Sequence, residues 1–373
     1  MKVAGYDAEN LPISDTRSCD WGLKYSNNEV CYPATLIVGD IVKAFKDGLY
    51  DPDNTCVAIT QTGGQCRASN YISLIENGYV NTPVVSLALG SGISNDQPGF
   101  SINWSKIVPI ALAAVLYSDC IAKFYYASVV REREQGQAAG LRDLYLEKAK
   151  VAILRKSMGD LYRDLSLAAR DFDRICQQKF TPKVGVVGEI FLKFNPFAQK
   201  NVMSWLVDKQ IEVIPPLMSD FFMQSFVNLK AMQDSHLKRK YVPDVVIDWL
   251  YGKVRKQINR INEIGKEFKY FLPFESIYEK AENAKRVISL NAQFGEGWLI
   301  AGEMVSFAAR GINHVISLQP FGCIANHIVE KGIEKRIKSF YPQVNILSLD
   351  FDSSVSDVNI VNRMLLFIDN IKK

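Results

Sequence analysis

One stretch near the carboxyl end, residues 314–329 with the sequence HVISLQPFGCIANHIV, most constrains how this chain folds. Its β-branched start predicts a strand that ends at Pro320 and Gly322, and Cys323 follows just before an amphipathic helix expected from about Asn326. A strand that turns into a helix in this way is typical of the rim of a parallel α/β sheet, where ligands bind. Because the start of a helix favours thiolate over thiol, we expect Cys323 to be a metal ligand or a reactive sulfur.

The same alternation of strands and helices runs through much of the chain and predicts an α/β fold with doubly wound parallel sheets. A chain of 373 residues exceeds the roughly 250–300 residues at which one hydrophobic core stops growing. We therefore expect two domains, an α/β domain with a helical extension at residues 1–180 and a second α/β domain at residues 181–373. The first has only two convincing strands, so residues 1–30 or a partner chain should complete its sheet. Strands are expected at residues 56–59, 83–89, 183–187, 211–214, 314–318 and 344–349.

Composition argues against several classes of protein. The net charge of +4 comes from 44 basic and 40 acidic residues spread along the chain, so it favours neither nucleic acid nor a membrane as a partner. The amino-terminal residues contain no apolar core of a signal peptide, which predicts a cytoplasmic protein. The most apolar segment, residues 107–130, contains Asp119 and Lys123 and is predicted to be a buried helix instead of a membrane span.

The seven cysteines are odd in number, widely spaced and without a CxxC pair. In a chain without a secretion signal this pattern disfavours a disulfide framework and a zinc ribbon, and it favours free thiols or metal ligands. We interpret Cys19 as a half-exposed structural thiol or an additional ligand. Cys56, Cys120 and Cys176 are expected in the core.

Three cysteines, Cys31, Cys66 and Cys323, each sit at a strand end or a helix start. Such positions fall on one edge of a doubly wound sheet, so the three thiols are candidates to converge across a cleft between the domains. Three thiolates held by backbone loops suit an iron–sulfur cluster. The alternative is that each is simply a small buried hydrophobic residue.

Glycines and carboxylates lie beside these cysteines in the sequence. Gly63, Gly64 and Gly322 would let backbone N–H groups approach the sulfides of a cluster. Glu189 ends a strand and Glu296 precedes a helix, so both are candidates to face the cleft and to relay protons or hold a ligand water. Their alternative role is that of a capping or solvated acid.

The helix after Cys323 has a basic face. It is most simply solvated, and the alternative is that it docks an acidic ATPase partner or a CoA phosphate. His327, one turn after Cys323, is interpreted as a helix-surface residue. The basic residues are Lys331, Lys335, Arg336 and Lys338.

Longer motifs resemble a known family. NNEVCYPATLIVGDIVKAFKDGLYD, TQTGGQCRASNYISLI, VGVVGEIFLKF, GEGWLIAGEM and LQPFGCIANHIVEKGIEKRIKSFYP, followed by NILSLDFD, are similar to the carboxyl-terminal portion of the large acyl-CoA dehydratase activase proteins. That portion is in turn similar to the cluster-carrying subunits of 2-hydroxyacyl-CoA dehydratases. The resemblance covers the chain from about Cys19 to its end.

The resemblance implies two flavodoxin-like α/β domains with one [4Fe-4S] cluster between them. The family's three widely separated cysteine ligands fall on Cys31, Cys66 and Cys323, and the fourth iron is left to a water, a hydroxide or a substrate oxygen. The full-length activases carry an actin-like ATPase domain, but this sequence has no such nucleotide motif, no Walker A sequence and no GxGxxG. The resemblance therefore implies a separate ATPase activator with the actin-like fold.

These expectations combine into one leading hypothesis. The chain would be an oxygen-sensitive iron–sulfur protein that accepts a low-potential electron from an ATP-dependent activator for radical dehydration or reduction of an acyl-CoA substrate. It would act as a lyase or as the reductive activation component of one. The alternatives are electron transfer without substrate chemistry, or a cluster-free interaction partner of the ATPase. A homodimer and a pairing with a dehydratase subunit both stay open.

Overall fold

A four-stranded parallel sheet in the order β4-β3-β5-β6 forms the centre of the larger lobe. Its strands are β3 (Lys183–Gly188), β4 (Glu212–Ile214), β5 (His314–Pro320) and β6 (Asn345–Phe351), and all neighbours pair in parallel. The computed structural model describes residues 1–27, 29–60, 66–76, 82–86, 100–239, 242–354 and 357–371. The predicted α/β class with parallel sheets is confirmed.

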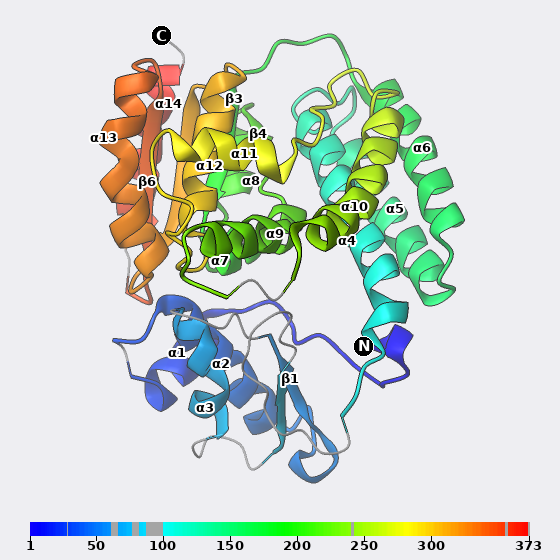
Figure 1. Ribbon diagram of the computed structural model, residues 1–373, viewed down its shortest axis with the longest axis vertical. Coiled ribbons are helices and arrows are strands. Elements are labelled where there is room, and N and C mark those ends of the chain that lie inside the picture. Colours follow the sequence, from blue (N-terminus) through cyan, green and yellow to red (C-terminus); the bar gives the residue numbers. More distant parts are fainter. Residues whose placement is uncertain are drawn as a thin grey trace.

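Helices cover both faces of this sheet (Figure 1). On one face, Ile316 and Leu318 of β5 pack with α8 (Val202–Asp208) and α14 (Asp357–Ile371). On the other face, Val315 packs with α12 (Gly297–Ala309) and α13 (Lys331–Phe340). Because side chains alternate along a strand, Ser317 and Gln319 face the same side as Val315, toward α12. The sheet is therefore doubly wound.

A second core lies among helices beside the sheet. It is built from α4 (Trp104–Ser128), α5 (Gln137–Leu154), α6 (Met158–Ile175), α9 (Met218–Asp234), α10 (Asp244–Gly265) and α11 (Ile277–Lys285). Asp119 of α4 accepts hydrogen bonds from the first backbone N–H groups of α9, Met218 N at 3.0 Å and Ser219 N at 2.9 Å. Helix α4 is long and apolar enough to cross a membrane by length and composition, and half of its most apolar 18-residue window is buried.

The amino-terminal lobe lies below both cores in Figure 1. It contains α1 (Thr16–Tyr25), α2 (Tyr32–Lys46), α3 (Tyr71–Glu76) and a two-stranded parallel sheet of β1 (Val57–Ile59) and β2 (Val84–Ser86). The expectation that residues 1–30 complete this sheet is wrong for the residues that the structure describes, because they contribute α1 instead. Asp15 and Ser18 form a capping box at its start, which favours a helix. Short 3₁₀ turns are Lys2–Ala4, Pro52–Asn54 and Arg67–Asn70.

Helix α2 belongs to both lobes. Tyr32 and Leu36 pack into the core of the four-stranded sheet, whereas Ala34 and Val38 pack into the core of the amino-terminal lobe. Two apolar faces on one helix explain why it is almost completely buried.

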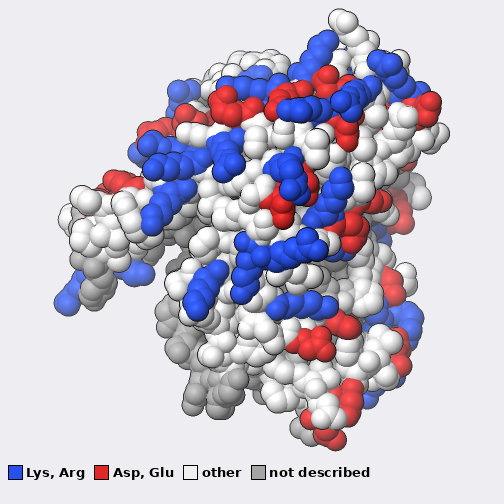
Figure 2. Space-filling view, turned by 90° about the vertical axis from the view of Figure 1, so that its right-hand side faces the viewer, with Lys and Arg blue, Asp and Glu red and all other residues white. Residues whose placement is uncertain are grey.

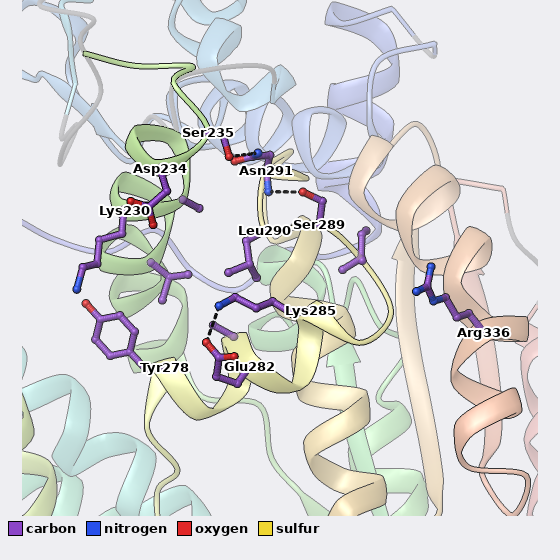
Figure 3. Close-up of a pocket in the computed structure, with 14 residues that line it drawn as sticks. Lys230, Asp234, Ser235, Tyr278, Glu282, Lys285, Ser289, Leu290, Asn291 and Arg336 are labelled. Atoms are coloured by element: carbon purple, nitrogen blue, oxygen red, sulfur yellow. Dashed lines mark hydrogen bonds and ion pairs between the residues drawn. The ribbon is translucent and has the colours of Figure 1, made fainter. Parts of the chain in front are cut away.

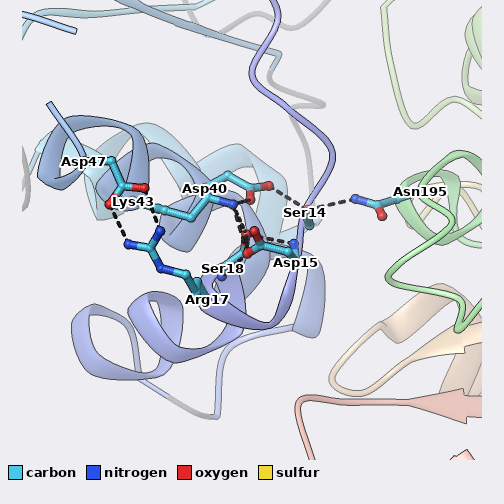
Figure 4. Close-up of polar contacts among 8 residues, drawn as sticks. All are labelled: Ser14, Asp15, Arg17, Ser18, Asp40, Lys43, Asp47 and Asn195. Carbon is cyan, nitrogen blue, oxygen red and sulfur yellow. Dashed lines mark hydrogen bonds and ion pairs between the residues drawn. The ribbon is translucent and has the colours of Figure 1, made fainter. Parts of the chain in front are cut away.

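Polar contacts also join the lobes (Figure 4). Ser14 donates to Asp40 at 2.6 Å and accepts from the Nδ2 of Asn195 at 3.0 Å. Asn195 ends the short helix α7 (Ile190–Phe194), which follows Glu189. Lys43 of α2 lies 3.0 Å from Asp15. The segment that begins at Glu189 is therefore attached to the amino-terminal lobe at its far end.

Candidate functional site

Three loops meet where the two lobes touch. The backbone N–H of Tyr32 donates to the carbonyl of Phe321 at 3.1 Å. Gly322 has a φ of 78°, and a Cβ placed on it would lie 3.1 Å from the Cα of Cys31 and 3.5 Å from the guanidinium of Arg67. The loops that carry the three predicted cysteine ligands therefore lie side by side, although hundreds of residues separate the first two from the third.

The three thiols are near enough to influence each other. Cys66 raises the pKa of both Cys31 and Cys323 by charge repulsion, although burial is the larger cause in each case. The Cys31 sulfur lies 3.0 Å from the hydroxyl of Tyr71, and the Cys323 thiol donates to the Oδ1 of Asn326 at 3.1 Å. The loops of Cys31 and Cys323 are thus in backbone contact, the Cys66 loop is linked to them through Arg67 and through charge, and the convergence of the three thiols on one cluster stays a prediction.

Protonation of these thiols differs from the sequence-based expectation. We expected the helix start to favour a Cys323 thiolate, but burial and the neighbouring carboxylates of Glu189 and Glu296 raise its pKa instead. Burial also raises the pKa of Cys31. A bound metal cation reverses this balance, since it stabilises thiolates and releases their protons.

The donor set decides which metal group the site suits. Within the described residues, no three or more His, Cys, Asp or Glu side chains are arranged to hold a single metal ion. An iron–sulfur cluster makes a different demand, because each cysteine binds a different iron and the sulfur atoms stand around the cluster. Three thiols on converging backbone loops fit that soft, cysteine-only chemistry.

Of the three predicted glycines, Gly322 lies at this junction. Its positive φ and its approach to Cys31 both disfavour a side chain, so the residue type is explained by geometry. Gly63 and Gly64 lie outside the described residues.

The two predicted carboxylates, Glu189 and Glu296, reach the same site. Glu189 follows β3, and its side chain caps α7 by accepting from the N–H of Leu192 at 3.0 Å. Burial and repulsion from Glu296 raise the pKa of Glu189 to about 8. Glu296 is 3% exposed just before α12, and burial raises its pKa too. With a pKa of about 8, the carboxyl group of Glu189 favours the protonated form near neutral pH.

Sequence reasoning missed two buried charged residues beside this pair. Lys193, four residues after Glu189, is 1% exposed, and its charge lowers the pKa of Glu189, Glu296 and Glu303. Glu303 is 3% exposed in α12. The available signal was a lone charge in an otherwise apolar segment, IFLKF for Lys193 and WLIAGEM for Glu303.

Comparisons with known proteins assign no family. No family model, curated protein or solved structure matches this chain.

The other four cysteines differ in their surroundings. Cys19 of α1 interacts with the hydroxyl of Tyr32, and its nearby charges are those of α1, α2 and Lys200. Cys120 and Cys176 are buried as expected, but Cys56 is exposed. The core prediction for Cys56 is wrong because it precedes β1 instead of lying within it.

The segment after Cys323 begins with a π-helical turn, Ala325–Glu330, before α13. His327, in this turn, lies 3.5 Å from the carboxylate of Asp350, which also pairs with Lys331 at 3.0 Å. Further along α13, Lys338 pairs with Glu334. The predicted basic face is therefore partly neutralised by acids of its own neighbourhood.

A cavity of about 580 Å³ lies between α9, α11 and residues 286–291 (Figure 3). Figure 3 shows Lys230 of α9 and Arg336 of α13 on opposite sides of it, with Lys285 and Asn291 between them. Its volume lies within the range of small-molecule sites. Residues 286–291 continue directly to Glu296, so one wall of the cavity is connected to the cysteine site through the chain.

On the face that carries the helical core, basic side chains gather across the middle of the view, and acidic side chains lie above and below them (Figure 2). Both signs of charge are therefore present among the described residues there. This distribution agrees with the small net charge of +4.

Proposed function

We propose that the chain is a [4Fe-4S] protein of the 2-hydroxyacyl-CoA dehydratase and activase group. Cys31, Cys66 and Cys323 would hold the cluster between two flavodoxin-like lobes. The observation that supports this most is the meeting of the three cysteine loops, with Gly322 against Cys31 and electrostatic coupling of Cys66 to both other thiols.

The bound cluster would supply a low-potential electron and an iron with an open coordination position as a Lewis acid. The chain's own residues do the rest. The Tyr71 hydroxyl, 3.0 Å from the sulfur of Cys31, orients that ligand and donates to its thiolate. Glu189, whose pKa is raised to about 8, would hold a proton near Cys323, and Glu296 would supply a second buried carboxyl group there.

The proposal includes a partner and a compartment. An ATPase activator with the actin-like fold would deliver the electron, and the sequence given holds no nucleotide-binding motif that could serve in its place. A low-potential cluster with an open iron is oxygen-sensitive, and we place the protein in the cytoplasm. An acyl-CoA thioester is the proposed substrate for dehydration or reduction.

Two alternatives remain distinct from this proposal. In the first alternative, the chain carries the cluster and transfers electrons without substrate chemistry. In the second, it binds the ATPase without any cluster. The cavity of about 580 Å³ is large enough for a small molecule, but none of the three cysteines lines it, so it does not separate these alternatives. Binding of acyl-CoA compounds to the reduced protein, measured by calorimetry, separates substrate chemistry from simple electron transfer.

Iron and acid-labile sulfide analysis of anaerobically purified and reconstituted protein tests the proposal. We expect about four irons for each chain, as a cubane requires, with broad visible absorbance. Alanine at Cys31, Cys66 or Cys323 should abolish both, whereas Cys56→Ala, which changes an exposed cysteine before β1, should keep them. A colourless, iron-free parent protein under these conditions would overturn the proposal.

A further inference from the structure

Helix α12 carries a polar stripe through an otherwise apolar interior. Glu296 precedes the helix, Glu303 follows seven residues later, and Arg310 follows after seven more. Seven residues make about two helical turns, so the three side chains share one face with a spacing of roughly 10 Å. Most of the remaining α12 residues are buried and apolar. The stripe runs from the cysteine site at one end of the helix toward solvent at the other.

Lys193 bridges the two glutamates. It is 1% exposed, and its charge lowers the pKa of both Glu296 and Glu303, so it lies within electrostatic range of each. Its Nζ, the Oε1 of Glu296 and the Oε2 of Glu303 have no hydrogen-bond partner among the described groups. Buried polar atoms nearly always have partners, so three such atoms on residues within electrostatic range of one another indicate bound water among them.

The outer half of the stripe ends at a water-sized cavity. Glu303 interacts electrostatically with Lys280 and Asp220, which form a buried ion pair with each other. The Oε2 atom of Glu303 has no hydrogen-bond partner among the described groups. These three residues line a cavity of about 20 Å³ together with Glu275 and Arg310. That volume accommodates one water molecule. The side chains of Arg310 and Glu275 are 29% and 16% exposed, so the cavity leads to the surface.

We propose that Glu303 and Lys193 form a proton pathway from the surface at Arg310 to Glu296 beside the cysteine site. A proton from water in the cavity passes to the carboxylate of Glu303. Glu303 passes a proton to the bound water beside Lys193, and that water, oriented by the charge of Lys193, passes a proton to ionised Glu296. Glu303 and the water return to their starting states, and Glu296 has gained the one proton that moved inward without any co-reactant.

Other charges facing the pathway set its electrostatic environment. Lys123 of α4 lines the same cavity, where burial lowers its pKa to about 8. Burial raises the pKa of Glu303. Glu189 lies at the inner end, where it is repelled by Glu296. The use of the delivered protons in a reaction rests on the proposed function. The exchange of protons between Glu296 and solvent does not require a bound cluster, so it can be measured separately.

The test follows the infrared carbonyl band of protonated buried carboxyl groups after the full-length, metal-free protein is mixed rapidly with D₂O. This band shifts when a carboxyl proton is replaced by deuterium. We expect the band of Glu189 and Glu296 to exchange at least tenfold more slowly in Glu303→Gln and in Lys193→Met. Glu189→Gln and Glu296→Gln identify which part of the band belongs to each group.

Glu330→Gln is the matched control. Glu330 is also buried, with a raised pKa and a carboxylate oxygen without a partner, but it lies on the π-helical turn outside the stripe. Its substitution should remove its own signal and leave the other exchange rates unchanged. Arg310→Gln, at a partly exposed position, should slow exchange and provides a second route if a buried variant does not fold.

Unchanged exchange in Glu303→Gln, Lys193→Met and Arg310→Gln would overturn the pathway, and so would equal slowing by Glu330→Gln. Iron analysis reports on the proposed function separately. A chain that binds no iron but shows the expected exchange pattern would retain the pathway and lose the cluster. The reverse result would retain the cluster and lose the pathway.

Discussion

Gly322 approaches Cys31 so closely that a Cβ on the glycine would lie 3.1 Å from the Cα of the cysteine. The two residues come from different lobes and from opposite ends of the chain. The carbonyl of Phe321 accepts a hydrogen bond from Tyr32 beside them. The relative position of the first and third cysteine loops is thus fixed by backbone contact.

Gly322→Ala should therefore destabilise the protein and lower its iron content after reconstitution. The φ of 78° is strained for alanine, and the added methyl group meets backbone atoms that have little room to move. We expect a loss of roughly 1–3 kcal/mol in the free energy of unfolding, measured with urea. Gly252→Ala is the control, because Gly252 lies in α10 with nothing within 4 Å, and alanine there should stabilise the helix by up to about 1 kcal/mol. Equal effects of the two substitutions would contradict the prediction.

Because of Glu189, the free energy of unfolding should fall as pH rises from 4.5 to about 8. Burial and Glu296 raise its pKa from 4.5 to about 8, so the folded protein retains a proton that the unfolded chain releases. The stabilisation is complete below pH 4.5 and is lost as pH approaches 8. Denaturant unfolding at several pH values should give a flatter profile for Glu189→Gln than for the parent. Glu147→Gln, at an exposed position of α5, should keep the parent's slope.

The buried ion pair of Arg131 and Glu212 should be a strong stabilising contact between the helical core and the edge strand β4. The guanidinium lies 2.7 Å from the carboxylate, and the side chains are 3% and 2% exposed. Glu212→Ala leaves the arginine buried without its counter-charge, and we expect it to cost about 3–5 kcal/mol.

The exposed pair of Lys150 and Glu147 provides the comparison for that prediction. Glu147→Ala should change the free energy of unfolding by less than about 1 kcal/mol, because solvent screens the interaction. Thermal and urea unfolding measure both variants under the same conditions. A small effect of Glu212→Ala would show that water reaches Arg131.

Asp119 should be needed for the start of α9. Its carboxylate accepts from Met218 N and Ser219 N, although burial raises its pKa to about 6. Asp119→Ala leaves two buried N–H groups without acceptors, which should cost roughly 2–4 kcal/mol in unfolding free energy. Asp119→Asn retains one acceptor and should lose less. Equal losses in the two variants would argue against the capping role.

Long, strongly patterned elements were predictable from the sequence. Strand β3 was expected at residues 183–187 and is observed at Lys183–Gly188, and β6 was expected at residues 344–349 and is observed at Asn345–Phe351. The helix α1 at the start of the chain was not predicted. Residues 1–30 or a partner chain were expected to complete a sheet, although Asp15 and Ser18 carry the local signal for the start of a helix. The small number of strands in the amino-terminal lobe does not determine the secondary structure of residues 1–30, whereas the capping box does.

The site was predictable where strand ends define it and not where distant charges meet. Glu189, Gly322 and Cys323 follow strands, so their placement on one rim was expected. The raised pKa of Cys323 depends on Glu189 and Glu296, which are far from it in sequence. Lys193 escaped notice because its buried position depends on contacts between separate helices.

Helix α2 is shared between the lobes, with Tyr32 and Leu36 seated on one core and Ala34 and Val38 on the other. A single substitution at a buried position of this helix would therefore disturb both cores at once. Because Cys31 is the N-cap of this helix, its backbone is held by the packing of both lobes.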